Sequence, residues 1–178
     1  PTGIVAVLAG SGAEGYADGV GAYASFKNPA GLKLGPDGYL YLADLGNHCV
    51  RRVNPSTGHV ATVAGRPIVG AADGRLEECL FDCPRDVALT SCGRFIFVAD
   101  SQNCRIRMLD MHQRTVSTIV GKRSVDTPTG LYLDESTSQL IFTQDYAVRA
   151  VSLPVVHAPV PAGHALHPSL PAPPPPQS

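Results

Sequence analysis

Two acidic and two basic side chains stand at matched spacing in this sequence. Asp44 precedes Arg51 by seven residues, and Asp100 precedes Arg107 by the same interval. The residues between them read as a hairpin, which brings a carboxylate and a guanidinium within reach of a charge-assisted hydrogen bond. Such a pair can serve in catalysis, but an active site occurs once. Because this arrangement recurs, we expect both pairs to hold their hairpins together.

Histidine and cysteine are the residues best suited to binding a transition metal. His48, His59 and His112 fall in predicted loops or outer strands at positions that do not correspond to one another. They are not expected to converge, and His48 is interpreted as an exposed loop residue. The sequence therefore predicts neither a bound metal nor a cofactor.

The cysteines are odd in number and show no obvious disulfide framework. They are Cys49, Cys79, Cys83, Cys92 and Cys104. Zinc binding by Cys79, Cys83 and Cys92 is not favoured, because no second pair or nearby histidine completes a tetrahedral spacing. We expect reduced or mixed thiols. A single disulfide from Cys92 to Cys79 or Cys83 is the alternative, since hairpin-linked segments could bring these positions together.

Two glycine-rich segments, 11–19 and 66–74, invite comparison with phosphate-binding loops. Neither has the Lys-Ser/Thr ending or the following helix that phosphate binding of this kind requires. Asp18 and Asp73 stand alone in these segments, whereas calcium needs several oxygen ligands. We interpret both segments as connectors between repeated units.

The elements that carry these residues form an internal repeat. Residues 28–65 align with residues 83–121 through a proline motif, an apolar strand, a hairpin and a final Val-Ala-Thr-Val-Ala-Gly or Val-Ser-Thr-Ile-Val-Gly. Pro29 and Pro84 are 55 residues apart, and Asp44 and Asp100 are 56 apart. An alignment of this length indicates duplicated structural units.

A third copy begins at Thr127-Pro128-Thr129-Gly130, after a connector reduced to residues 122–126. It has Gln144 where the other copies have aspartate, and it lacks the final strand. The second copy departs at Asp86, where the other two have glycine. After Ser152 the chain is rich in proline, alanine and histidine, which predicts a disordered, polyproline-like tail.

Each full copy has four short apolar segments separated by turn sequences, which predicts a four-stranded antiparallel meander. The second segment, 39–43 or 95–99, is continuously apolar, so both of its faces should be buried. Radially packed blades of a β-propeller bury a sheet in this way. A two-sheet sandwich is the alternative, but it does not explain why a whole unit recurs with its turns and charged positions.

The order of these motifs resembles the NHL repeat. The matching features are Pro-x-Gly, aromatic-Leu-Tyr-Leu-Ala-Asp, Asn-x-x-Val-Arg and Val-Ala-Thr-Val-Ala-Gly, with a connector ending in Asp-Gly, and they extend over residues 1–152. The resemblance implies an all-β chain of propeller blades. NHL domains are mostly six-bladed, so about three blades of four-stranded antiparallel sheet would form an incomplete ring.

The phase of the repeat divides the chain into five parts. Residues 1–10 are predicted to be the last strand of a preceding blade, 11–65 the first blade, 66–121 the second, 122–152 a partial third, and 153–178 the Pro-rich tail. The chain starts at Pro1 without an initiator Met or a signal pattern, and we expect it to be a piece of a longer protein. Its open blade edges are expected to meet the remaining blades or a second copy.

Charge and hydropathy restrict the function. The chain has 14 Lys+Arg against 15 Asp+Glu, a net charge of −1, which argues against a generic binder of nucleic acid or anionic membrane. No apolar run approaches the roughly 20 residues of a membrane helix. We therefore expect a scaffold, and not an enzyme. It is expected to bind a protein partner through its loop face, the end of the blades formed by the connectors and by the hairpin loops between second and third strands. The candidate binding residues are Asn47, His48, Arg85, Gln102 and Asn103.

Two other functions are left open. The chain could be the non-catalytic part of a metal-dependent propeller hydrolase or lyase whose ligands lie in blades outside it. Single-stranded RNA binding, as in some NHL proteins, would need a basic face with stacking aromatics. Only a few basic residues are expected near the loop face, and they are Lys27, Arg66, Arg75, Arg85 and Arg105.

Overall fold

The computed structural model describes residues 3–154 as β-strands with two single-turn 3-10 helices. The predicted tail, 153–178, lies outside the described residues apart from Leu153 and Pro154. The strands are β1 (Gly19–Val20), β2 (Pro29–Leu34), β3 (Leu40–Asp44), β4 (Cys49–Val53), β5 (His59–Gly65), β6 (Gly74–Arg75), β7 (Pro84–Leu89), β8 (Phe95–Asp100), β9 (Arg105–Asp110), β10 (Thr115–Val120), β11 (Pro128–Asp134), β12 (Gln139–Gln144) and β13 (Ala147–Ser152). The helices are η1 (Gly21–Tyr23) and η2 (Leu45–Asn47), and no helix in this part of the chain could cross a membrane.

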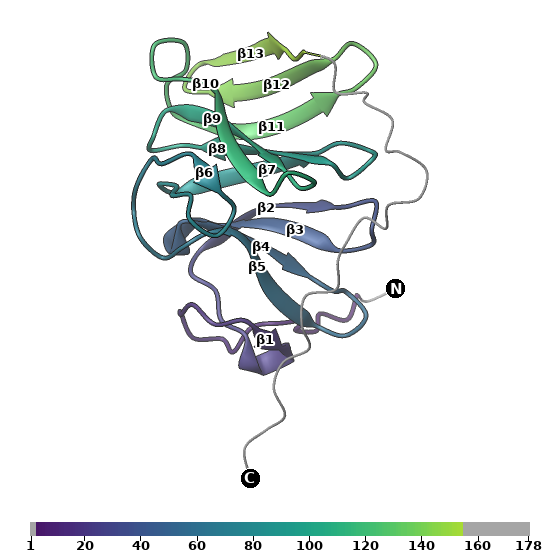
Figure 1. Ribbon diagram of the computed structural model, residues 1–178. Coiled ribbons are helices and arrows are strands. Elements are labelled where there is room, and N and C mark those ends of the chain that lie inside the picture. Colours follow the sequence, from purple (N-terminus) through teal and green to yellow (C-terminus); the bar gives the residue numbers. More distant parts are fainter. Residues whose placement is uncertain (1–2, 155–178) are drawn as a thin grey trace.

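Three antiparallel sheets stack face to face, as Figure 1 shows. Blade 1 has the strand order β1-β5-β4-β3-β2, blade 2 has β6-β10-β9-β8-β7, and blade 3 has β11-β12-β13. The predicted meander of four strands is present in blades 1 and 2. Each connector does more than join blades, because it ends in a short strand that pairs with the outermost strand of its own blade: Gly19 lies opposite Val60, and Gly74 opposite Val116.

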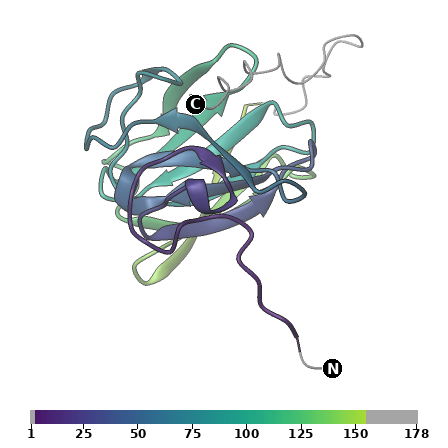
Figure 2. The same cartoon turned by 90° about the horizontal axis from the view of Figure 1, so that it is seen from below.

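The opening segment, which is predicted to be the last strand of a preceding blade, has no strand partner among the described residues. Residues 3–9 form no strand, and Figure 2 shows them running away from the sheets. Ile4, Val5 and Val7 are exposed. A fourth strand needs a third strand as its hydrogen-bonding partner, and the described residues provide none for this segment. From Gly10 onward the chain packs on blade 1, where Ala24 and Phe26 cover the face of β3 that carries Leu42.

The second strand of each full blade is buried on both faces, as its continuous apolar sequence predicts. In β8, Ile96 and Val98 pack against blade 1, in a core that includes Tyr41 of β3. Phe97 of the same strand packs against blade 3, in a core that includes Phe142 of β12. Alternate side chains of a strand point to opposite faces, so β8 contributes to both junctions between blades. This burial contributes apolar contacts to the stacking of all three sheets.

The first strand of every blade contains an irregularity at the same repeat position. The register shifts between Ala30 and Leu32, between Pro84 and Val87, and between Pro128 and Leu131. The bulges therefore surround Gly31, Asp86 and Gly130. A bulge bends its strand and redirects the side chain it carries, which places the unusual Asp86 between neighbouring blades.

Asp86 contacts both neighbouring blades, and on one side it depends on the glycine that blade 1 has at the same repeat position. Its Oδ2 accepts a hydrogen bond of 2.8 Å from the backbone N–H of Leu131 in blade 3. On the blade 1 side it lies against Gly31, where an added Cβ would be 2.1 Å from Asp86 Oδ1 and 2.5 Å from its Cα. The glycine at position 31 therefore lets the first strands of blades 1 and 2 come into direct contact.

Within residues 3–154, blade 3 has neither the buried ion pair of the other two blades nor their fourth strand. Gln144 is buried where Asp44 and Asp100 stand, and its Oε1 accepts the N–H of Asp126 at 3.4 Å. Arg149, at the position of Arg51 in the repeat, is exposed. Val148 and Tyr132 are also exposed on this blade, which agrees with the predicted apolar surface at an open blade edge.

Candidate functional site

Arg51 on β4 is completely buried at the centre of an ionic network. Its Nη1 donates to Asp44 Oδ2 at 2.7 Å and to the carbonyl of Ser25 at 3.2 Å. Its Nη2 donates to Asp18 Oδ1 at 2.8 Å and to the carbonyl of Ala17 at 2.7 Å. One guanidinium therefore ties the β3–β4 hairpin to the connector of the same blade.

Blade 2 repeats this network around Arg107. Its Nη1 lies 2.7 Å from Asp100 Oδ2, and its Nη2 lies 2.7 Å from both Asp73 Oδ1 and the carbonyl of Ala72. Asp73 also accepts the backbone N–H and the hydroxyl of Thr118, both at 3.1 Å. The second acid thus fastens the connector to the outermost strand, β10.

The charged groups in these networks are paired with one another. Burial raises the pKa of the Asp100 carboxyl, while Arg107 and other hydrogen-bond donors oppose this effect. The Arg107 guanidinium is also stacked on Phe81, 5.1 Å from the ring centroid, where a cation is attracted by the ring face. Paired, buried and stacked groups of this kind hold the blade and its connector together.

Asp18 and Asp73 were not expected to take part in these networks. Sequence analysis left them as isolated connector residues, although they lie 55 positions apart and each is followed by glycine. That recurrence was the signal in the sequence that could have identified them as structural residues. A repeated acid in a loop indicates a repeated partner, and the partner in each blade is the buried arginine.

The predicted binding residues Asn47 and Asn103 are both buried in structural contacts. Asn47 Nδ2 donates to Asp44 Oδ2 and to the carbonyl of Gly15, each at 2.8 Å. Asn103 Nδ2 donates to Asp100 Oδ2 at 2.9 Å and to a connector carbonyl at 2.6 Å. Both amides complete the ionic networks, so they are not surface groups for a partner.

Arg85 and Gln102 are exposed, as the prediction of a binding face requires. Gln102 is held by its backbone, whose N–H donates to the carbonyl of Asp82 at 3.1 Å. Large apolar side chains are exposed on the same end of the blades: Ile68 and Val69 in the connector of blade 2 are 55% and 58% exposed. Tyr146, in the turn between β12 and β13, is fully exposed.

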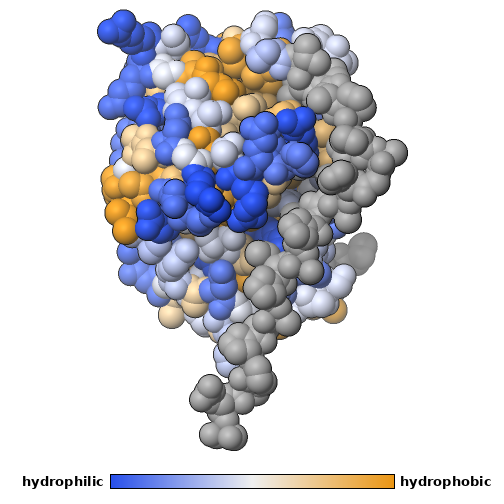
Figure 3. All heavy atoms as spheres, in the orientation of Figure 1, coloured by the Kyte–Doolittle hydropathy of each residue, from blue (hydrophilic) through white to orange (hydrophobic). Residues whose placement is uncertain are grey.

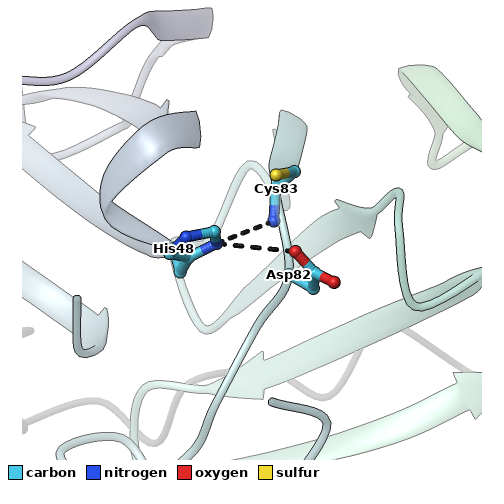
Figure 4. A group of neighbouring side chains, drawn as sticks. All are labelled: His48, Asp82 and Cys83. Atoms are coloured by element: carbon cyan, nitrogen blue, oxygen red, sulfur yellow. Dashed lines mark hydrogen bonds and ion pairs between the residues drawn. The ribbon is translucent and has the colours of Figure 1, made fainter. Parts of the chain in front are cut away.

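His48 is not the exposed loop residue that the sequence suggested. Its side chain is 16% exposed and lies at the junction of blades 1 and 2. Nδ1 accepts the backbone N–H of Cys83 at 3.1 Å and lies 3.7 Å from Asp82 Oδ1. Figure 4 shows the His48 imidazole directed at the backbone nitrogen of Cys83 and at the Asp82 carboxylate. They are the one group of three His, Cys, Asp or Glu residues in residues 3–154 whose ligand atoms all lie within 4.8 Å of one another.

Known proteins share this repeat. No protein-family profile matches the chain. NHL repeat-containing protein 2 of Bos taurus is 32% identical over 114 residues, which are 63% of this chain and 16% of that protein. Protein SUPPRESSOR OF QUENCHING 1, chloroplastic, of Arabidopsis thaliana is 37% identical over 103 residues, which are 58% of this chain and 10% of that protein.

Solved structures share the fold. A structural genomics protein of unknown function from Bacteroides thetaiotaomicron has a TM-score of 0.57 at 21% identity, over 64% of this chain and 32% of its own. A nidogen/laminin complex has a TM-score of 0.53 at 21% identity, over 67% of this chain and 41% of the matched chain. The chain consists of NHL-repeat β-propeller blades. It spans only 10% and 16% of the two curated relatives described above.

The cysteines of these NHL blades are all free. A disulfide between Cys83 and Cys92 does not form, because the two residues lie at opposite ends of β7, a strand of six residues and so about 20 Å long. Cys79 is buried in the core between blades 1 and 2. Cys79, Cys83 and Cys92 are therefore not gathered at one place in the structure.

Thiol labelling of the native NHL blades should discriminate among the five cysteines. Burial raises the pKa of Cys49 to about 12 and that of Cys79 to about 11, and thiol reagents attack through the thiolate. We expect iodoacetamide at neutral pH to modify Cys92 and Cys104, with Cys49 and Cys79 modified only after unfolding. Mass spectrometry of the labelled peptides would contradict this if Cys49 reacted as fast as Cys104.

Proposed function

We propose that these NHL blades form a protein-binding scaffold whose partner docks on the loop face. The loop face is the end of the blades formed by the connectors 11–18 and 66–73 and by the turns 45–48, 101–104 and 145–146. The observation that supports the proposal is the exposure there of Ile68, Val69 and Tyr146, together with the exposure of Arg85 at the start of β7. Figure 3 shows hydrophobic residues at the left-hand edge, on the side where Figure 1 places the blade 2 connector.

The composition of this face suits a protein partner. Aromatic side chains and arginine are enriched where proteins bind one another, and exposed apolar groups at the centre supply most of the affinity. The connectors are fastened to the blades by Arg51 and Arg107, so the loops are presented on a rigid base. One structure with this fold is a complex of nidogen and laminin, which is consistent with a propeller binding a protein.

A binding role, and not catalysis, is also the proposal that fits the repeated charged residues. The carboxylates of Asp44 and Asp100 each accept hydrogen bonds from an arginine, an asparagine and a backbone N–H. A catalytic base needs a lone pair directed at its substrate. The lone pairs of these two carboxylates are directed at hydrogen-bond donors within the blade.

Paired variants of the full chain test the role of the loop face. The loop-face variant combines Arg85→Glu with Ile68→Ser. The control variant combines Ser56→Glu with Gln113→Glu, two exposed residues in turns at the opposite end of the blades. Both variants make the net charge more negative by two, so a general charge effect would appear in both.

Proteins retained by each immobilised chain from an extract of the source organism are compared by quantitative mass spectrometry. We expect a specific protein to be retained by the wild type and the control and to be lost about tenfold or more by the loop-face variant. Equal retention by all three chains would contradict a role for this face. Salt-sensitive retention of a single-stranded RNA oligomer, lost in the loop-face variant, would favour the RNA alternative instead.

A further inference from the structure

The junction between blades 1 and 2 contains three side chains of types that bind metal ions, and they come from two different blades. His48 lies in the turn after β3 of blade 1, and Asp82 and Cys83 lie immediately before β7 of blade 2. Their ligand atoms, an imidazole nitrogen, a carboxylate oxygen and a thiol sulfur, are all within 4.8 Å of one another. Figure 4 shows the imidazole of His48 directed toward Asp82 and Cys83 from the turn of the other blade.

The backbone at these positions does not require His48 or Cys83. Cys83 has φ 49° and Asn28, its equivalent in blade 1, has φ 50°. His48 has φ 53° and Cys104, its equivalent in blade 2, has φ 52°. The same left-handed backbone is thus built with different side chains elsewhere. The structural networks of this protein recur from blade to blade, whereas the His-Asp-Cys group occurs at one junction within residues 3–154.

The chemistry of the donors selects zinc. Nitrogen of histidine, sulfur of cysteine and a carboxylate oxygen are the three ligand types that zinc accepts, at about 2.0–2.3 Å, and two ligands on a tetrahedral ion are about 3.3–3.8 Å apart. The 3.7 Å between His48 Nδ1 and Asp82 Oδ1 already lies in this range. The sulfur of Cys83 lies within 4.8 Å of both other ligand atoms, so it would have to move closer to them when the ion binds.

The hydrogen bonding of His48 is compatible with metal binding through Nδ1. Its Nδ1 accepts a hydrogen bond from the backbone N–H of Cys83, so Nδ1 has no proton and its lone pair is directed toward the Asp82–Cys83 segment, with Asp82 Oδ1 3.7 Å away. A metal ion at this position would replace that hydrogen bond. We propose that His48, Asp82 and Cys83 bind one zinc ion across the junction of blades 1 and 2, with the fourth position open to water or a further ligand.

Zinc bound in this way would fasten two blades together on the loop face. A ligand that binds only the folded chain raises its stability by mass action. The thermal unfolding midpoint should therefore rise when zinc is added. This effect does not depend on whether the loop face binds a protein.

The test is a titration of the full reduced chain with Co²⁺, followed by displacement with Zn²⁺. Tetrahedral cobalt gives visible d–d bands, and cobalt bound to a thiolate adds a charge-transfer band in the near ultraviolet. We expect about one equivalent of cobalt, with the thiolate band, and its loss when zinc is added. The histidines of the C-terminal tail cannot produce the thiolate band, because the tail has no cysteine.

Three variants assign the ligands. Cys83→Asn copies the residue that blade 1 has at this position, and His48→Asn places there a residue that tolerates positive φ. Cys104→Asn makes the matched change outside the cluster. Circular dichroism confirms that each variant is folded.

Cys83→Asn should abolish the thiolate band, and His48→Asn should weaken zinc binding about 100-fold or more. Cys104→Asn should retain both properties. The absence of a thiolate band in the wild-type chain would overturn the proposal. So would a band that persists in Cys83→Asn or that disappears equally in Cys104→Asn.

Discussion

Replacing Arg107 with methionine is expected to lower the free energy of unfolding by about 3–5 kcal/mol, because a buried ion pair that loses one partner leaves an uncompensated charge. Arg107 and Asp100 are both fully buried, and their atoms are 2.7 Å apart. Methionine would fill much of the space without satisfying the carboxylate. Urea denaturation followed by circular dichroism measures the loss.

Arg149→Met is the matched control for Arg107→Met. Arg149 stands at the equivalent position of blade 3, but it is exposed, and its replacement should change the free energy of unfolding by less than about 0.5 kcal/mol. Equal losses in the two variants would contradict a structural role for the repeated pair.

The loss in Arg107→Met should depend on pH. Burial already raises the pKa of Asp100 in the folded protein, and removing the arginine that opposes this effect would raise it further. The folded variant then binds a proton more tightly than the unfolded chain does, so its stability falls as pH rises through the folded-state pKa and recovers as pH falls. The difference in stability between wild type and variant should therefore narrow on acidification. A difference that widened would show that Asp100 is not the destabilised group.

Replacing Gly31 with alanine is expected to cost about 3 kcal/mol, because the added methyl group would meet the backbone of the neighbouring blade. The Cβ would lie 2.5 Å from the Cα of Asp86 and 2.7 Å from the carbonyl oxygen of Arg85. Rotation of a side chain cannot relieve contacts with backbone atoms. The first strands of blades 1 and 2 would have to separate, and the free energy of unfolding reports the cost.

Gly130→Ala changes the same repeat position in blade 3. Its Cβ would meet only the Thr143 hydroxyl, at 2.9 Å, so we expect a smaller loss than for Gly31→Ala. The two glycines are indistinguishable in the repeat alignment. Similar losses in both variants would mean that the bulge itself, and not contact between blades, requires glycine.

Features within one blade could be predicted from the sequence because they depend on neighbours along the chain. Burial of both faces of β8 follows from its continuous apolar residues, and contact of Asp44 with Arg51 follows from a hairpin of seven residues. The repeat placed each of these features twice. Agreement between two copies is stronger evidence than either copy alone.

Features that join distant segments could not be predicted in the same way. Asp18 meets Arg51 from 33 residues away, and Asp86 meets the N–H of Leu131 from 45 residues away. The burial of Asn47 and His48 depends on a connector and on the next blade. Polar residues in a turn look exposed in a sequence, and only the packing of blades shows which of them are covered.

Amide hydrogen exchange at Leu131 tests most directly whether the three sheets pack as propeller blades. This amide donates to Asp86 across the junction of blades 2 and 3, and protection of it reports that contact. We predict slow exchange in the wild-type chain and a selective acceleration at Leu131 in Asp86→Ala, with the amides of β3 and β4 unchanged. Exchange at Leu131 as fast as in the exposed segment Ile4–Leu8, or unaffected by Asp86→Ala, would contradict the packing of these sheets as adjacent blades.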